Sequence, residues 1–142
     1  MKKALRPAFT VTIPVLCGYL FIGFAFGVML RDAGFTAPWA FLSSLTIYAG
    51  SGQYLLVSLL AANSSLVTVA VMTLLLNCRH IFYGLSFLDT FYQMGRAKWY
   101  MIFSLTDETY SLLCSLKTPD GVDPAAMRFL ISVLDQSYWI IG

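Results

Sequence analysis

An arginine and the chain's single histidine, Arg79 and His80, interrupt a long apolar stretch of this sequence. No Asp, Glu, Lys or Arg occurs from residue 33 to residue 78, and the apolar pattern resumes after His80. A charged side chain at the centre of a bilayer costs about 2.5–3.5 kcal/mol and usually faces a partner, a cavity or a substrate path. Arginine can bind a carboxylate through two parallel hydrogen bonds, and histidine can exchange a proton near neutral pH. The pair therefore indicates a functional site inside a membrane.

Further polar groups surround this pair at helical spacing. Asn77, His80 and Tyr83 are three residues apart, and residues with that spacing share one face of a helix. We expect Arg79, Asn77, His80 and Tyr83 to contribute to a substrate site. The alternative is that Arg79 and His80 lie at a membrane edge and extend their polar ends to water.

Two adjacent carboxylates, Asp107 and Glu108, lie within the apolar run 99–116. Left unpaired at mid-bilayer they would together cost about 5–7 kcal/mol. Pairing one of them with Arg79 removes much of that cost, and protonation of the other removes its share. We therefore predict Asp107 as a substrate contact, and Glu108, Asp107 and His80 as candidates for carrying a proton. The alternative is that 99–116 consists of two short interfacial pieces with a wet turn between them.

Glycines break the apolar run 36–62 near its middle, in the sequence Gly50-Ser51-Gly52-Gln53. Glycine weakens a helix, and unwound backbone at that depth is tolerated only when it is buried in protein or lines a watery cavity. Many transporters use such discontinuous helices to contact substrate, so Gly50, Ser51 and Gln53 are candidate substrate-binding residues. A flexible or closely packed continuous helix is the alternative.

The composition places these residues in a membrane protein. Hydrophobic residues make up 58% of the chain and charged residues 11%, against about 45–50% and 25% in soluble domains. About 20 apolar residues form one membrane-crossing helix. We predict an all-α, polytopic integral membrane bundle that forms a single domain over 1–142, with a discontinuous or re-entrant second segment. The expected spans are 8–30, 36–62 with a break near 50–53, 66–88, 99–116 and an incomplete 129–142.

Basic residues suggest how the bundle is oriented. One group precedes the first span (Lys2, Lys3 and Arg6), and Arg96 and Lys98 lie between later spans. Such groups favour the cytoplasmic side, which predicts a multi-pass protein of the cell inner membrane with a cytoplasmic N-terminus. If 36–62 crosses fully, Arg96 and Lys98 fall outside; if it re-enters, both groups lie inside. Both alternatives remain open at this point.

Several other functions find no support in the sequence. The net charge of +2, without a basic run interleaved with aromatic residues, argues against nucleic acid as a partner. The cysteines lie singly in apolar runs without metal-ligand spacing, so neither a metal nor another cofactor is expected. A Gly-rich phosphate loop with lysine is also missing, which argues against an ATP-driven pump.

Four motifs in their order resemble the AzlC-type branched-chain amino acid permeases, along essentially the whole chain. The motifs are Gly18-Tyr19-Leu20 with Gly23-Phe24-Ala25-Phe26-Gly27, Tyr48-Ala49-Gly50-Ser51-Gly52-Gln53-Tyr54, Leu76-Asn77 with Arg79-His80 and Tyr83-Gly84, and Thr106-Asp107-Glu108 with Tyr110. Phe21 departs from the proline that is common in the family after the first motif. Because members continue with further transmembrane helices, the resemblance also implies a C-terminally truncated form.

The resemblance implies the large subunit of a two-component secondary transporter that exports branched-chain amino acids and is not an enzyme. Its obligate partner would be a small AzlD-type membrane subunit in the lipid bilayer, and a homo-oligomer is an open alternative. Arg79 then becomes a candidate clamp for the carboxylate of the amino acid, and the transport can be proton-coupled. The competing hypotheses are a non-transporting truncated subunit that only binds a partner, and a membrane-embedded enzyme using His80 with Glu108 or Asp107 as acid and base.

Overall fold

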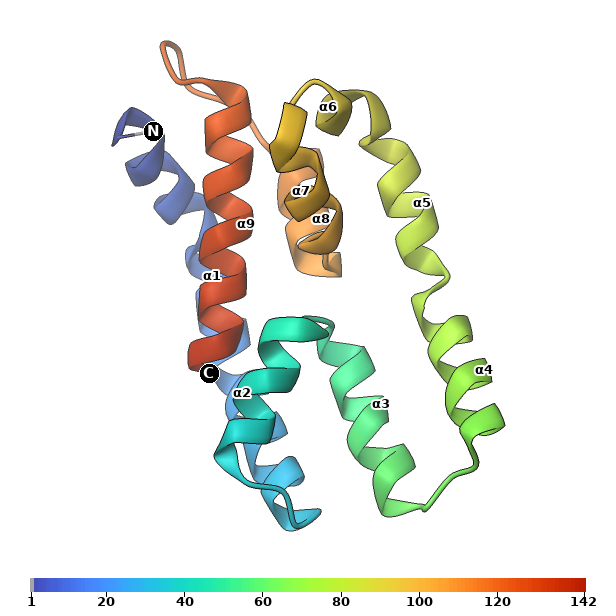
Figure 1. Ribbon diagram of the computed structural model, residues 1–142. Helices are drawn as coiled ribbons and strands as arrows, with labels where there is room; N and C mark the ends of the chain where they lie inside the picture. Colours follow the sequence, from blue (N-terminus) through green and yellow to red (C-terminus); the bar gives the residue numbers. More distant parts are fainter. Residues whose placement is uncertain (1) are drawn as a thin grey trace.

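The computed structural model describes residues 2–142, and every regular element within them is a helix. This confirms the all-α prediction. The elements are α1 (Lys2–Asp32), α2 (Ala37–Thr46), α3 (Gly50–Ala61), α4 (Leu66–Asn77), α5 (Arg79–Ser86), α6 (Leu88–Tyr92), the 3₁₀ turn η1 (Gly95–Ala97), α7 (Lys98–Phe103), α8 (Asp107–Ser115) and α9 (Pro124–Ile141). Figure 1 shows them as an elongated bundle.

Helix α1 runs the length of the molecule (Figure 1). Its 31 residues correspond to about 45 Å at 1.5 Å per residue, more than the roughly 30 Å of a bilayer core. The helix continues through Pro14. A second stretch, Leu66–Ser86, is also long and apolar enough to cross a membrane. It contains α4 and α5, which together run opposite to α1 with a break at Cys78.

Helices α2 and α3 form a hairpin whose tip lies about halfway along the molecule (Figure 1). The break falls at residues 47–49, immediately before the predicted 50–53, which instead form the first turn of α3. Tyr48 in the break has a φ of 42°, in the left-handed region that non-glycine residues seldom adopt. Gly50 fits here because a β-carbon at this position would lie 3.1 Å from the ring of Trp139. The prediction of a discontinuous second segment is therefore confirmed.

The stretch 99–116 differs from the expected single span. It consists of α7 and α8, joined by a break at residues 104–106, and this second hairpin enters from the end opposite to the first (Figure 1). Thr106 in the break has an extended backbone, and its hydroxyl accepts a hydrogen bond from the N–H of Thr109. Hydroxyl side chains compete in this way with the helical backbone. The alternative predicts two short interfacial pieces with a wet turn; the structure has two short helices here, and the interfacial position and the wet turn stay predictions.

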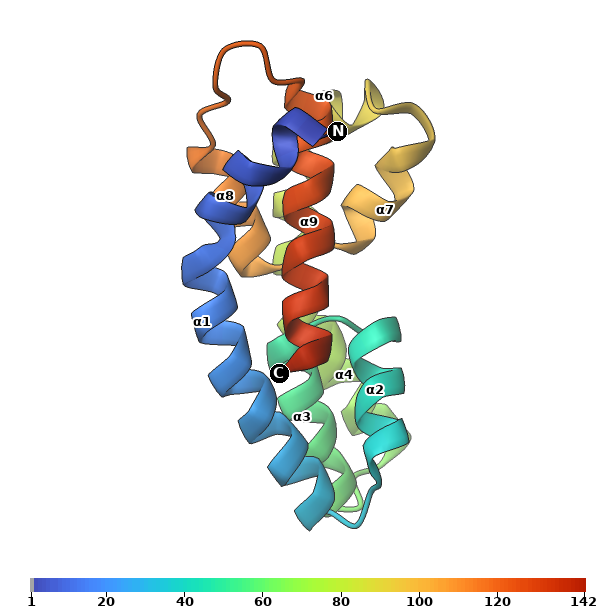
Figure 2. The ribbon, with the colours of Figure 1, turned by 90° about the vertical axis from the view of Figure 1, so that its left-hand side faces the viewer.

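The same arrangement thus occurs twice in opposite directions. A long segment runs from one end to the other, and the hairpin after it returns only halfway, so the two tips meet near the middle (Figure 1). Helix α9 lies alongside α1 (Figure 2) and supports the tip of the first hairpin through a buried cluster of Tyr19, Tyr48, Tyr138 and Trp139. The α1 N-terminus and the turn between α6 and α7 lie at the same end (Figure 1).

Candidate functional site

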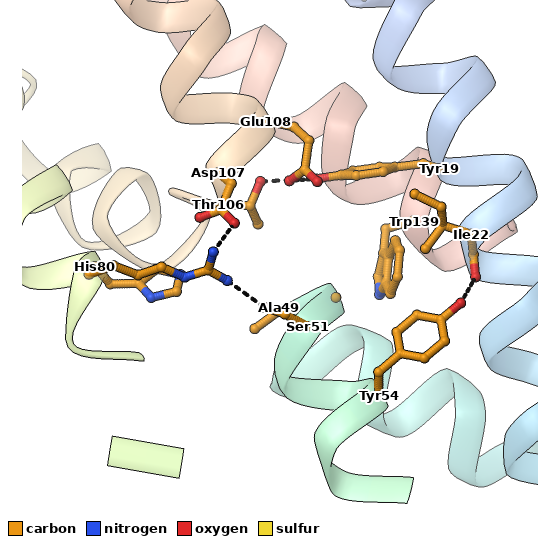
Figure 3. Close-up of a pocket in the computed structure, with 12 residues that line it drawn as sticks. Tyr19, Ile22, Ala49, Ser51, Tyr54, His80, Thr106, Asp107, Glu108 and Trp139 are labelled. Atoms are coloured by element: carbon orange, nitrogen blue, oxygen red, sulfur yellow. Dashed lines mark hydrogen bonds and ion pairs between the residues drawn. The ribbon is translucent and has the colours of Figure 1, made fainter. Parts of the chain in front are cut away.

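A cavity of about 160 Å³ lies where the two hairpin tips approach each other (Figure 3). Residues from α1, from both tips, from α5 and from α9 line it: Tyr19, Ile22, Ala49, Gly50, Ser51, Tyr54, Arg79, His80, Thr106, Asp107, Glu108 and Trp139. Charged, hydroxyl-bearing and apolar side chains therefore face one space.

Arg79 joins the two tips. Its guanidinium forms an ion pair with the carboxylate of Asp107 on the second hairpin and donates a hydrogen bond to the hydroxyl of Ser51 on the first. This is the only salt bridge within residues 2–142, and both charged side chains stay about one third exposed, at 35% and 37%. Arg79 Nε and Asp107 Oδ1 have no hydrogen-bond partner. These two atoms are buried, so the pair retains one unsatisfied donor and one unsatisfied acceptor.

Helix N-termini add positive potential to this cavity. Helices α3 and α8 begin beside it at Gly50 and Asp107, and a helix N-terminus carries partial positive charge and unpaired N–H groups. Thr106 caps α8, whereas the residue that precedes α3, Ala49, has no side-chain acceptor. The first N–H groups of α3 are thus available to an anion such as a carboxylate.

Glu108 is held from the other side by α1. The hydroxyl of Tyr19 donates to Glu108 Oε2 over 2.8 Å and lies 2.9 Å from Thr106 Oγ1 (Figure 3). Tyr19 is buried, whereas Glu108 is exposed toward the cavity. Our sequence reasoning missed Tyr19 as a site residue, because the only signal was its place in the Gly18-Tyr19-Leu20 motif.

The helix break at Cys78 divides the predicted polar helix face of Asn77, His80 and Tyr83. His80 lines the cavity, and its Nδ1 lies 3.2 Å from the carbonyl oxygen of Asn77. Asn77 itself donates to a backbone carbonyl one turn earlier and does not line the cavity. Tyr83 stacks on Tyr110 with ring centroids 4.3 Å apart, also outside the cavity lining. The break at Cys78 separates Asn77 from the helix that carries His80.

Gln53 also lies outside the cavity lining, where we expected a substrate contact. Its side chain is fully buried, and its amide donates to the hydroxyls of Ser43 and Ser44 at 3.2 Å each. The indole N–H of Trp139 donates to Gln53 Oε1 over 2.7 Å. Gln53 therefore ties α2, α3 and α9 together and positions the tip that carries Ser51.

An apolar wall completes the cavity. Ile22 and the Trp139 ring face it, and the hydroxyl of Tyr54 donates to the carbonyl of Ile22 over 2.6 Å (Figure 3). Trp139 and Tyr54, like Tyr19, were missed as site residues. A cation, a carboxylate, free N–H groups and an apolar wall can together hold a small zwitterion that has an apolar side chain.

Metal ligands do not gather in the described part of the chain. No three His, Cys, Asp or Glu side chains within residues 2–142 lie close enough to hold a metal ion. Cys17, Cys78 and Cys114 are free thiols at exposed positions. The chemistry of the cavity therefore has to be derived from its ion pair, hydroxyls and helix ends.

Comparison with known proteins gives consistent matches. The family model described as AzlC protein matches residues 14–142. The branched-chain amino acid transport protein AzlC of Bacillus subtilis is 35% identical over 98% of this chain, and an uncharacterized membrane protein of Helicobacter pylori is 42% identical over 99%. The inner membrane protein YgaZ of Escherichia coli is 33% identical over 70%. No solved structure matches the chain.

The chain spans about half the length of the relatives that it matches. It covers 55% of the Bacillus protein, 61% of the Helicobacter protein and 42% of YgaZ. The relatives carry names of membrane proteins, in agreement with the apolar composition and the two long apolar helices. The matched region contains both hairpins and every residue that lines the cavity.

Proposed function

Because this chain belongs to the AzlC protein family, we propose that it takes part in the membrane transport of branched-chain amino acids. The observation that supports this most directly is the Arg79–Asp107 pair at the meeting point of two opposed hairpin tips. The Bacillus relative is named for transport of this substrate class. In transporters, substrate sites are typically formed near mid-membrane by discontinuous helices.

The amino acid binds in this proposal with its charges at opposite partners. Its carboxylate contacts Arg79 and the free N–H groups at the start of α3, near Gly50 and Ser51. Its ammonium group binds Asp107, whose Oδ1 has no other partner. The apolar side chain then lies against Ile22 and Trp139. His80 completes the binding site.

Substrate binding also loosens the connection between the hairpins. The substrate carboxylate competes with Asp107 for the guanidinium of Arg79, which otherwise holds the two tips together. A ligand shifts a conformational equilibrium only through such a difference in its contacts between the two states. We propose that the cavity opens alternately to the two membrane sides, with export as the direction of net transport.

The distribution of basic residues supports a multi-pass topology with a cytoplasmic N-terminus in the inner membrane. The start of α1, with Lys3 and Arg6, lies at the same end as the turn between α6 and α7, with Arg96 and Lys98. The positive-inside tendency assigns this end to the cytoplasm. The hairpin formed by α2 and α3 is what brings both groups to one side.

We further propose that the chain acts as the large subunit together with a small AzlD-type membrane subunit. Glu108, Asp107 and His80 line the cavity, and side chains of these types can take up and release a proton. Transport coupled to a proton gradient therefore fits the site.

Reconstitution of the protein with the AzlD-type subunit in vesicles tests this function. We expect leucine or valine flux that increases with an imposed pH gradient. Arg79→Ala should abolish substrate binding, while Arg96→Ala, a matched arginine at the end of the molecule, should retain it. Absence of flux would contradict transport, and association with the small subunit without flux would favour the non-transporting alternative. Undiminished leucine affinity in Arg79→Ala would remove Arg79 from the carboxylate role.

A further inference from the structure

A continuous chain of hydrogen bonds connects Glu108 at the cavity to Asp135 in the interior of the bundle. Tyr19 bonds Glu108 over 2.8 Å and Thr106 over 2.9 Å. Thr106 Oγ1 lies 3.2 Å from Thr109 Oγ1, which donates to Asp135 Oδ2 over 2.9 Å. Three hydroxyl groups from α1 and the second hairpin thus link two carboxyl groups.

Asp135 has no role in the substrate site described above. Its side chain is 0% exposed, and its second oxygen, Oδ1, has no hydrogen-bond partner. The only salt bridge within residues 2–142 involves other residues, so no cation compensates it there. Burying an unpaired carboxylate ion is very costly, and such a group instead takes up a proton or a cation.

The titratable groups near Asp135 come from α8, from the break between α2 and α3 and from α7, and none of them is cationic. Helix α8 contributes Thr109 and Glu108, the break between α2 and α3 contributes Tyr48, and α7 contributes Tyr100. Arg128 lies two turns earlier on α9 and is not paired with Asp135. The hydroxyl of Tyr48 is buried without a partner. A proton is therefore the ligand that fits this position, since it needs no additional space.

We infer that Glu108 and Asp135 exchange a proton through the hydroxyls of Tyr19, Thr106 and Thr109. We call these two carboxyl groups and three hydroxyl groups the relay. The relay connects the substrate cavity with a buried acid that no cation neutralises. Glu108 is its open end, because it lines the cavity and also a second, wider cavity between α1 and α8.

The transfer balances at every atom. In the structure Thr106 donates to Thr109 and Thr109 donates to Asp135. When Asp135 carries the proton, these two hydroxyls rotate, so that the Asp135 O–H donates to Thr109, Thr109 to Thr106, Thr106 to Tyr19, and Tyr19 to Glu108. Each O–H bond along this line breaks as the next one forms. Glu108 ends as the carboxylic acid and Asp135 as the carboxylate, while each hydroxyl again carries one proton and the total charge is unchanged. Reversal of all the bonds returns the proton to Asp135.

The relay rests on the proposed transport function, because it supplies the coupling step of a proton-driven transporter. Glu108 lies next in sequence to Asp107, which pairs with Arg79. A substrate that displaces Asp107 from Arg79 changes the charge beside Glu108, and this shifts the proton along the relay. Movement of substrate and movement of the proton are thereby linked.

Transport by variants of Thr109 tests the relay. The protein and its AzlD-type subunit are reconstituted in vesicles, and leucine accumulation driven by a pH gradient is compared with leucine exchange at equal pH. Thr109→Val removes the hydroxyl from the middle of the relay and should lower gradient-driven accumulation by about tenfold or more, a 1.4 kcal/mol effect, with exchange retained. Thr109→Ser keeps a hydroxyl and should restore accumulation.

Thr12→Val provides the matched control. Thr12 is also a fully buried threonine, and it lies 3.1 Å from the hydroxyl of Tyr138, outside the relay. This variant should accumulate leucine like the unmodified protein. Normal gradient-driven accumulation in Thr109→Val would overturn the relay. Loss of exchange in both Thr109 variants would also overturn it, because Thr109 would then serve only the folding of the tip.

Infrared difference spectroscopy tests the relay independently of transport. In the purified protein, a step in buffer pH should change a carboxylic acid C=O band that is lost in Asp135→Asn. Thr109→Val should slow this change by about tenfold or more. An equal rate with and without the Thr109 hydroxyl would overturn the relay even if transport is confirmed. A band slowed in Thr109→Val, in a protein that moves no leucine, would keep the relay and contradict only the transport function.

Discussion

Ser51 and Asp107 lie on hairpins that enter the molecule from opposite ends, and both bind the guanidinium of Arg79. The three residues belong to α3, α8 and α5, and each stands in the first turn of its helix. One side chain therefore holds together the tips of two elements that otherwise approach each other only at their ends. This link is the feature on which we expect the site to depend.

Arg79→Lys should weaken substrate binding even though it keeps the charge. Lysine carries a single ammonium group and cannot reproduce the planar fork that reaches two partners at once. We expect leucine affinity to fall by about tenfold or more, measured as the dissociation constant in detergent. Because the ion pair is about one third exposed, the free energy of unfolding should change by no more than about 1 kcal/mol.

Asp107→Asn distinguishes a direct role of Arg79 from an indirect one. The variant leaves the guanidinium free of its intramolecular partner, so a small carboxylate such as acetate should bind more tightly than in the unmodified protein. The amino acid itself should bind more weakly, because the partner for its ammonium group is lost. If both ligands respond in the same direction, Asp107 does not discriminate between the two charges.

Gly50→Ala should disturb the first tip through a contact with α9. The added methyl group would lie 3.1 Å from the Trp139 ring, and overpacking of this kind costs about 1–3 kcal/mol. We expect a lower melting temperature and weaker leucine binding. Gly27→Ala is the matched control, because its β-carbon would meet no atom within 4 Å. Equal melting temperatures for the two variants would show that the Trp139 contact does not constrain Gly50.

Gln53→Leu should destabilise the protein and have little direct effect on substrate affinity. The change removes the acceptor for the indole N–H of Trp139, and leaving such a group unpaired costs about 1–3 kcal/mol. Gln93→Leu, at an exposed position, serves as the control and should leave the melting temperature unchanged. A stable Gln53→Leu protein that no longer binds leucine would instead support the direct substrate contact predicted from the sequence.

The residues that could be predicted are of types that are energetically unfavourable within a membrane helix. Arg79 and Asp107 stand out as charges in apolar sequence, and pairing them follows from the energy of isolated charges. The structure does bring them together. The glycines at 50–53 likewise indicated a discontinuous segment to within three residues.

The parts that escaped prediction depend on contacts between distant segments. Tyr19 reaches Thr106 across 87 positions, and Trp139 reaches Gln53 across 86. Neither aromatic residue differs in type from the many that face lipid, so no local pattern identifies it. The second hairpin was missed as the main expectation because its break contains Ser104 and Thr106, hydroxyl residues that are common within membrane helices, and no glycine.

The position of residue 64 decides between the two topologies that the sequence left open. In the structure, α2 and α3 return to the end from which they entered, so the turn at residues 62–65 lies opposite to the α1 N-terminus (Figure 1). If 36–62 crossed fully, this turn would lie on the same side as the N-terminus. In a variant without native cysteines, Ser64→Cys in intact cells should react with an impermeant maleimide added outside.

Thr118→Cys provides the matching probe for that labelling experiment. It lies in the loop between α8 and α9, at the same end as the α1 N-terminus (Figure 1). This cysteine should react only after the membrane is permeabilised, because the basic groups assign that end to the cytoplasm. Labelling of residue 118 in intact cells and of residue 64 only after permeabilisation would invert the orientation. Protection of both residues until permeabilisation would contradict the hairpin and favour a full crossing by 36–62.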